Sequence, residues 1–239
     1  MQPKWKAFAV LSFSILTAST AQAVVLTSLE WPPYTGAALP DQGKTSQVVR
    51  AAFSASGEAL TIKFLPWQRA VDEAKVNPDV VGYFPEYLDP KSSCLFSEPI
   101  GYGPLGFAQS RDKPVVWENL DDLKDKKIGV VSGYVNTQEF DNRVASNEIK
   151  ADSTNSDLQN LLKLSNGRLD LAVIDENVMN YLLTSEPKLK DVAAKINFNE
   201  KKLENKTLHV CFTDSPAGKI ALQRFNDALA DESVKILIK

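Results

Sequence analysis

The stretch Phe96-Ser-Glu-Pro-Ile-Gly-Tyr-Gly-Pro-Leu-Gly-Phe-Ala108 lies between two sets of alternating strand and helix patterns. From residue 100 to residue 108 it carries no charge and is apolar or aromatic apart from three glycines. Those glycines, at positions 101, 103 and 106, permit backbone angles and close approaches that a Cβ atom would forbid. Two interpretations fit such a stretch: a crossing between two lobes, or an ordinary strand with bulges. The flanking sequence decides between them.

The segment before this stretch predicts strands alternating with helices. The predicted order is strand 24–29, helix 45–56, strand 59–64, a helix that opens at Leu65-Pro-Trp-Gln-Arg69, and strand 80–84. The loop Glu30-Trp-Pro-Pro-Tyr-Thr-Gly36 follows the first strand, which its two prolines stop. This alternation predicts parallel strand pairing with right-handed crossovers, typical of an α/β fold.

The same pattern restarts after the glycine stretch. It predicts strand 127–131, the segment Ser132-Gly-Tyr-Val-Asn-Thr137 leading into a helix, a helix from about residue 156, strand 169–175, helix 178–183, strand 207–212 and a last helix near 216–230. Residues 188–206 are charged and weakly patterned. Two α/β sets on either side of an apolar stretch favour the two-lobe interpretation.

The N-terminus predicts export. Lys4 and Lys6 precede an apolar run from residue 7 to about residue 20, and Ala21-Gln-Ala23 follows. These are the three parts of a secretory signal peptide, and the run is too short for a comfortable membrane anchor. We expect cleavage after Ala23, which leaves 239 − 23 = 216 residues in the periplasm, with no membrane anchor.

Composition narrows the possible partners. Losing two lysines changes the formal charge from −3 to −5, so no bulk electrostatic attraction to nucleic acid is expected. We expect a monomer that uses no cofactor and no metal. Cys94 and Cys211 are the only cysteines, and export makes a disulfide between them possible, although two separate thiols are the alternative.

The carboxyl ends of the predicted strands select a candidate site, because ligands of open parallel sheets bind there. The selected side chains are Trp31, Tyr34, Trp67, Arg69, Glu86, Lys91, Ser132, Tyr134, Asn136, Thr137 and Asp175. They combine aromatic surfaces, cations, hydroxyls, an amide and carboxylates, as a small polar ligand with an ionic head requires. Each also has a plainer interpretation: core aromatic, solvated cation, ordinary turn, or helix cap for Asp175.

The order of four motifs resembles that of the polar-amino-acid type (family 3) of bacterial extracellular solute-binding proteins. The motifs are Trp-Pro-Pro-Tyr after the first strand, Phe96-Ser-Glu-Pro99, Leu-x-x-Leu-x-x-x-x-Ile-Gly-Val-Val-x-Gly, and Gly167-Arg-Leu-Asp-Leu-Ala-Val-Ile-Asp175. The resemblance covers the mature chain. It implies the type II periplasmic-binding-protein fold, in which two lobes, each a mostly parallel sheet flanked by helices, close on the ligand. Lobe one would be 24–102 plus 213–239 and lobe two 103–212, with crossings near 98–106 and 205–214.

The resemblance also implies roles for individual residues. Trp31, Tyr34 and Trp67 would be the aromatic contacts of lobe one, Ser132 to Thr137 the donors of lobe two, and Asp175 the partner of an ammonium group. The family usually carries an arginine shortly before its Phe-Ser pair, where it clamps a carboxylate. Here Lys91 stands near that place. We therefore expect Arg69 to be the main anion-binding group and Lys91 a secondary one.

The function that follows is capture of a small polar or zwitterionic, amino-acid-like solute by lobe closure, without catalysis. The captured solute would be passed to an ABC transporter or reported to a membrane sensor. Two alternatives stay open. One is a dehydratase-like enzyme on the same fold, in which Glu86 is the extra acid or base. The other is a ligand-sensing partner of a membrane receptor.

Overall fold

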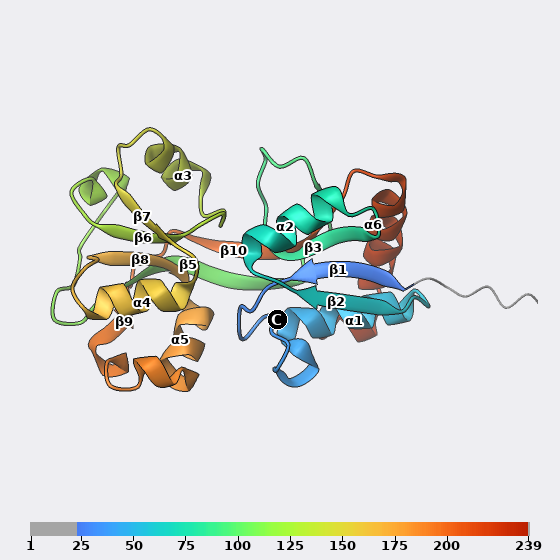
Figure 1. Cartoon of the computed structure of the whole chain (residues 1–239), viewed down its shortest axis with the longest axis horizontal. Helices are drawn as coiled ribbons and strands as arrows, with labels where there is room; N and C mark the ends of the chain where they lie inside the picture. The colour runs from blue at the N-terminus through green and yellow to red at the C-terminus, as the bar shows by residue number, and fades with distance from the viewer. Residues whose placement is uncertain (1–22, 239) are drawn as a thin grey trace, which may run out of the picture.

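The structure, a computed structural model, describes residues 23–238, so the predicted signal peptide lies outside the described residues except for Ala23. Two groups of helices and strands are joined by two long strands, β5 (Gly101–Ser110) and β10 (Glu204–Phe212) (Figure 1). This arrangement confirms the predicted two-lobed α/β fold. None of the helices in residues 23–238 is long and apolar enough to cross a membrane.

The first lobe, on the right of Figure 1, contains both ends of the described chain. Its elements are β1 (Val24–Ser28), η1 (Pro40–Gln42), α1 (Lys44–Ala55), β2 (Leu60–Phe64), α2 (Trp67–Val76), β3 (Val80–Tyr87), β4 (Leu95–Phe96), α6 (Pro216–Leu229) and α7 (Glu232–Lys235). Strand β1 pairs in parallel with β2 and with β3, as the strand–helix alternation predicts. Helix α1 buries one apolar face, and its Phe53 ring packs 5.2 Å from that of Phe225 in α6.

The second lobe, on the left of Figure 1, repeats this plan. Its elements are η2 (Leu120–Leu123), β6 (Ile128–Val131), α3 (Gln138–Ala145), β7 (Ala151–Thr154), α4 (Asp157–Ser165), β8 (Leu171–Asp175), α5 (Glu176–Ser185), η3 (Pro187–Leu189), η4 (Ala193–Lys195) and β9 (Ile196–Phe198). Strand β6 pairs in parallel with β7 and β8. Two short strands, β7 and β9, come in addition to the predicted set, because neither has a marked apolar pattern.

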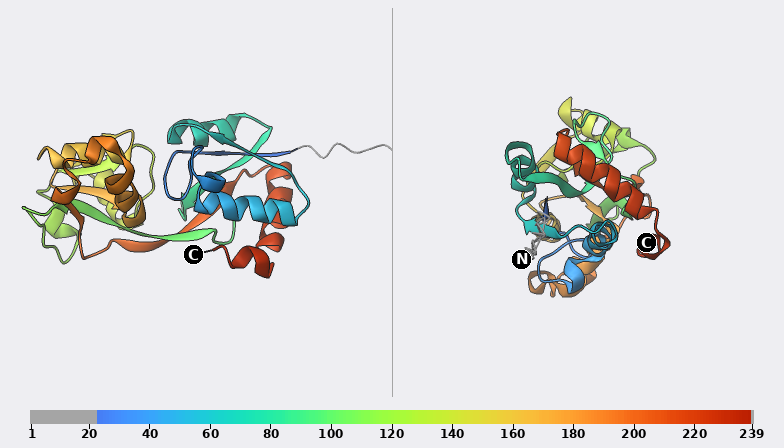
Figure 2. Two further views of the ribbon diagram at one scale, coloured as in Figure 1. Left: turned by 90° about the horizontal axis from the view of Figure 1, so that it is seen from below. Right: turned by 90° about the vertical axis from the view of Figure 1, so that its right-hand side faces the viewer.

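The two lobes share one continuous sheet, ordered β2-β1-β3-β10-β5-β8-β6-β7. The first part of β10 pairs antiparallel with β5, and its last part pairs with β3 and β4. The two crossing strands run along one edge of the molecule, as the left view of Figure 2 shows. These two strands are the connection between the lobes within the sheet.

The glycine stretch forms β5, and Gly103 shows why it needs glycine. A Cβ atom at this position would stand 1.9 Å from Oδ2 of Asp175 and 2.5 Å from the hydroxyl of Tyr34. Asp175 belongs to the second lobe and Tyr34 to the first. The glycine therefore lets two side chains from different lobes meet against the crossing strand.

A disulfide joins Cys94 to Cys211 at the base of the crossing, with 5.5 Å between their Cα atoms. Cys211 lies in β10, opposite Phe96 of β4. The two cysteines are 117 positions apart, and all the elements listed for the second lobe lie between them. The second lobe is therefore a long insertion into the first lobe, and the disulfide links the two ends of this insertion.

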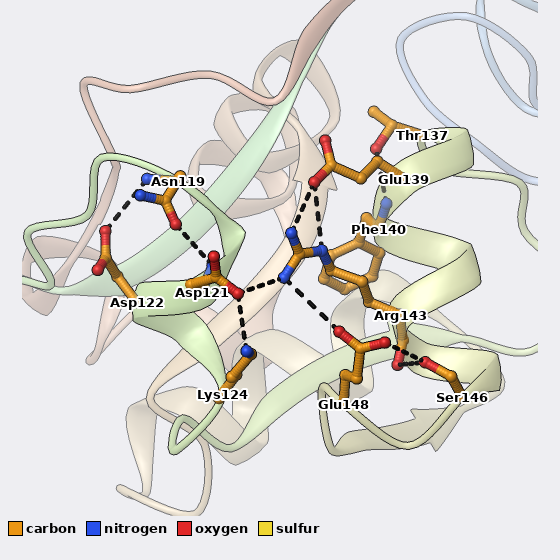
Figure 3. A network of polar contacts seen from close by, with 10 residues as sticks. All are labelled: Asn119, Asp121, Asp122, Lys124, Thr137, Glu139, Phe140, Arg143, Ser146 and Glu148. Carbon is orange, nitrogen blue, oxygen red and sulfur yellow. Dashed lines mark hydrogen bonds and ion pairs between the residues drawn. The ribbon is translucent and has the colours of Figure 1, made fainter.

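Helix α3 of the second lobe is fixed by a polar network around Arg143 (Figure 3). The Arg143 guanidinium contacts Asp121 of η2 at 2.7 Å and Glu139 of its own helix at 2.9 Å. Thr137 caps the helix, since its hydroxyl accepts a hydrogen bond from the N–H of Phe140. These contacts hold the segment 132–137, which precedes α3, in a fixed position.

Candidate functional site

A small cavity lies between the lobes, walled mainly by aromatic and apolar side chains. Its volume is about 20 Å³, which is space for about one water molecule. The lining residues are Leu29, Trp31, Trp67, Pro85, Glu86, Tyr87, Tyr134, Val135 and Leu208. Glu86 and Val135 also line a neighbouring groove of about 1000 Å³. The cavity therefore adjoins a wide groove that lies mainly on the first lobe, with Gly133 and Val135 of the second lobe at its border.

Four side chains of the first lobe reach hydrogen-bond partners in the second lobe around this cavity. The indole Nε1 of Trp31 donates to Oδ2 of Asp157 at 3.2 Å, and that of Trp67 donates to the carbonyl of Gly133 at 2.9 Å. The Tyr34 hydroxyl lies 3.1 Å from each carboxylate oxygen of Asp175. At the rim, Nζ of Lys91 donates to Oδ1 of Asn142 at 2.7 Å. The lobes are in direct contact.

Tyr134 of the second lobe stands between the two tryptophans of the first. Its ring centre lies 6.3 Å from that of Trp31 and 6.1 Å from that of Trp67, both edge to face. The Tyr87 ring lies 6.0 Å from Trp31, and the Tyr83 ring 5.5 Å from Trp67. Aromatic rings in such edge-to-face pairs attract one another, because the positive edge of one ring meets the negative face of the other.

Three buried carboxyl groups lie in or beside the cavity, and burial raises the pKa of each. The pKa of Glu86 rises to about 8, although a hydrogen bond from the N–H of Tyr87 opposes the rise. The pKa of Asp157 rises to about 7, where the hydrogen bond from Trp31 lowers it and the charge of Asp175 raises it further. The pKa of Asp175 rises to about 6. Each carboxylate is therefore costly to keep charged without a further positive partner.

No protein-family model matches the sequence, and no curated protein matches it either. Solved structures do. A histidine kinase sensor domain described as similar to periplasmic binding proteins superposes with a TM-score of 0.75 at 17% identity, covering 90% of this chain and 94% of that one. The GluR0 ligand-binding core from Nostoc punctiforme, in complex with L-glutamate, gives a TM-score of 0.69 at 16% identity, covering 90% and 96%.

A third structure, the substrate-binding protein of an amino acid ABC transporter, gives a TM-score of 0.69 at 18% identity and covers 90% of this chain and 97% of that one. All three likenesses extend over nearly the whole of both chains. This chain has the periplasmic-binding-protein fold.

Within the periplasmic-binding-protein fold, the predicted aromatic residues come together between the lobes. Trp31, Trp67 and Tyr134 line the cavity, and so does Glu86. Tyr34 and Asp175 meet beside it. Asp175 also caps α5, because its Oδ1 accepts hydrogen bonds from the N–H groups of Asn177 and Val178. Both interpretations of Asp175 therefore have a geometric basis.

The other predicted residues lie outside the cavity. Arg69 is exposed on α2 and lines neither the cavity nor the four larger pockets around it, and its expected role as the main anion-binding group stays a prediction. Lys91 is exposed at the rim. Ser132 is exposed, 2.7 Å from the hydroxyl of Ser153.

Two more predicted donors are engaged within the second lobe. The amide of Asn136 donates to Asp141 at 2.8 Å, and Thr137 caps α3. Their hydrogen-bonding groups position the segment before α3. The predicted set therefore divides into residues at the cavity, exposed residues outside it, and residues that support the segment before α3.

Three residues of the site were not predicted. Asp157 opens α4, where an acidic residue has the ordinary interpretation of a favourable helix start. Tyr87 lies in β3, which continues three residues beyond its predicted end at residue 84. Lys206 is buried in β10, with its Nζ 5.3 Å from the centre of the Tyr87 ring. Its predicted surroundings, 188–206, gave no pattern from which to place it.

Proposed function

We propose that this protein captures one small polar solute between its two lobes and closes on it, without chemical change to the solute. The observation that supports this best is the set of direct contacts around the cavity. Trp31, Tyr34 and Trp67 each bond to a group of the second lobe. The same polar groups can bind a solute when the lobes part, and the aromatic walls can enclose it.

The proposed movement is a rotation of residues 24–102 plus 213–239 against residues 103–212. The hinge would lie at the crossings near 98–106 and 205–214, which contain most of β5 and β10. Movement is needed because a cavity of about 20 Å³ cannot hold an amino-acid-sized solute. Domain closure around a ligand, by hinges at a few strand-terminal residues, is a common conformational change.

Two contexts fit such a binding protein: delivery to an ABC transporter in the periplasm, or reporting to a membrane sensor. Both use the same closed form and differ in the partner that recognises it. The proteins encoded beside this one would discriminate between the contexts, since a permease and ATPase indicate transport and a kinase indicates sensing.

A thermal-shift screen of amino acids, amines, sugars and small organic acids tests the binding proposal. A solute at about 100 times its Kd stabilises the folded protein by roughly 2.7 kcal/mol. For a protein of this size that corresponds to a rise of about 5–10 °C in the unfolding midpoint. A library in which no solute moves the midpoint beyond measurement error would remove the main support for the proposal.

One observation favours a second candidate, catalysis on the same fold. Glu86 is buried in the cavity wall, and burial raises its pKa to about 8, a value suited to proton transfer near neutral pH. Incubating the protein with each solute that binds, followed by mass spectrometry of the solute, tests this candidate. Recovery of every solute unchanged would leave binding as the function.

A further inference from the structure

Charge around the cavity indicates the class of solute. The cavity wall contains one ionisable carboxyl group, Glu86, and no lysine, arginine or histidine among its lining residues. Asp157 and Asp175 lie directly behind the wall, bonded to Trp31 and Tyr34. All three carboxyl groups are less than one tenth exposed. The surroundings of the cavity are therefore acidic.

The nearby cations lie outside the cavity wall. Lys206 lines a different pocket, with Asp89 and Asp141, and its Nζ lies 3.5 Å from Oε1 of Glu204. Lys91 bonds to Asn142 at the rim, and Arg69 is exposed outside the pockets. The Nζ of Lys206 also lies 5.3 Å from the centre of the Tyr87 ring. A solute carboxylate would find no free cation among the residues that line this cavity.

The hydroxyl of Tyr87 lacks a hydrogen-bond partner within residues 23–238, which is a second and independent indication of a ligand. Its side chain lines the cavity, is 7% exposed, and carries a hydroxyl for which the described residues supply no hydrogen bond. A buried hydroxyl without a partner is costly, so such a group points to something that binds there. Trp31 and Trp67, by contrast, already use their indole N–H groups and offer mainly their ring faces.

We propose that the solute is an organic cation, an amine or a quaternary ammonium compound, that carries no carboxylate. The inference rests on the proposed solute-binding function. Its positive group would lie among the rings of Trp31, Trp67 and Tyr134, whose faces attract cations when water is excluded. Glu86 would neutralise the charge, and the Tyr87 hydroxyl would accept a hydrogen bond from an N–H or contact a polarised C–H.

Matched pairs of compounds test this inference by titration calorimetry. Choline, cadaverine and agmatine are compared with betaine, lysine and arginine, which resemble them but carry a carboxylate. We expect at least one of the three cations to bind, and to bind at least tenfold more tightly than its carboxylate counterpart. The reason is that the added carboxylate would lie among buried carboxyl groups without a cation to pair with.

Two variants link the result to the cavity. Glu86→Gln keeps the shape and removes the charge, and it should weaken binding of the cation at least tenfold. Asp79→Asn, at an exposed carboxylate beside the start of β3, is the matched control and should change the affinity by less than twofold. Tyr87→Phe should also weaken binding but leave the unfolding midpoint without solute unchanged or higher, because its hydroxyl has no partner to lose.

The outcomes separate this inference from the function on which it rests. If an amino acid or an organic acid binds more tightly than every cation, the inference is overturned while solute binding stands. The same holds if Glu86→Gln leaves the affinity for the cation unchanged. If no solute of any class binds, the inference and the proposed function both fall.

Discussion

Trp31 in the first lobe donates a hydrogen bond to Asp157 in the second, at 3.2 Å between Nε1 and Oδ2. Both side chains are less than one tenth exposed. The contact connects an aromatic wall of the cavity with an acidic residue that opens helix α4. It therefore couples three properties of the protein that can be measured separately: contact between the lobes, buried charge, and the affinity for a solute.

The buried charge of Asp157 predicts a pH dependence of stability. Burial raises the pKa of Asp157 in the folded state to about 7, above the ordinary value of 3.8, so the folded state binds more protons between these two pH values. The stability that protonation gives is complete below about pH 4 and is lost as the pH rises through about 7. Asp175, Trp31 and Tyr134 are the groups that act on this carboxyl.

Replacing Asp157 with asparagine should remove the part of the pH dependence of stability that comes from this carboxyl group. We expect the unfolding midpoint of the wild type to fall between pH 5 and pH 8 by several degrees more than that of Asp157→Asn. Asp152→Asn, at an exposed carboxylate on the neighbouring strand β7, should keep the wild-type slope. Equal slopes in wild type and Asp157→Asn would show that the pKa of Asp157 is not raised.

Alanine substitutions at two glycines of β5, Gly103 and Gly101, should differ sharply in their effect on stability. Gly103→Ala forces a methyl group into the space of Asp175 and Tyr34, whereas at Gly101 the nearest atom, Cγ2 of Thr45, is 3.2 Å away. We expect Gly103→Ala to cost about 1–3 kcal/mol of stability, as overpacking does, and Gly101→Ala to cost less. Urea unfolding of both variants provides the comparison, and equal losses would mean that the Asp175–Tyr34 contact can move aside freely.

The disulfide predicts a stability that depends on oxidation. In the chain-entropy model, a bridge across a segment of this length stabilises the folded state by up to about 5 kcal/mol. Reduction should therefore lower the unfolding midpoint by up to roughly 10–20 °C, at about 2–4 °C per kcal/mol. Reductant should not change the unfolding midpoint of the double variant Cys94→Ser/Cys211→Ser. Mass spectrometry of the purified, non-reduced protein that finds two free thiols would contradict the bridge.

The exposed position of Arg69 predicts that its charge contributes little to binding. Arg69→Ala should change the affinity for the best solute by less than twofold, because the side chain lines none of the described pockets. A clamp that grips a carboxylate through two hydrogen bonds would instead be worth about 1.5–3 kcal/mol, or roughly ten- to a hundredfold. A tenfold loss of affinity, measured by calorimetric titration of Arg69→Ala, would show instead that Arg69 contributes to solute binding.

The sequence predicted the fold well where apolar periodicity is strong. Helices α1 and α2 each place apolar residues on one face, and strands β1 and β8 are apolar or β-branched except for their last residues, Ser28 and Asp175. Strand β7, with the sequence Ala-Asp-Ser-Thr, is polar and lies at the edge of the sheet, so nothing in its composition distinguishes it from a loop.

The site was predictable only in part. Trp31, Trp67 and Tyr134 follow strands, and the rule that ligands bind beyond the carboxyl ends of strands finds them. Asp157 enters the site because the second lobe turns α4 toward Trp31, and the two residues are 126 positions apart in the chain. Arg69 follows a strand too, yet the rotation of α2 directs it outward. Contacts across the lobes and the rotation of a helix depend on tertiary packing, which no local pattern contains.

Small-angle X-ray scattering can show whether a small solute holds the two lobes together, as we propose. The scattering of the wild type is measured without solute and at saturation with the compound that binds most tightly. Because the lobes touch through a few hydrogen bonds around a hinge, we expect open forms to be populated without solute. The account predicts that saturation lowers the radius of gyration. A solute that binds one to one and leaves the scattering profile unchanged would contradict it.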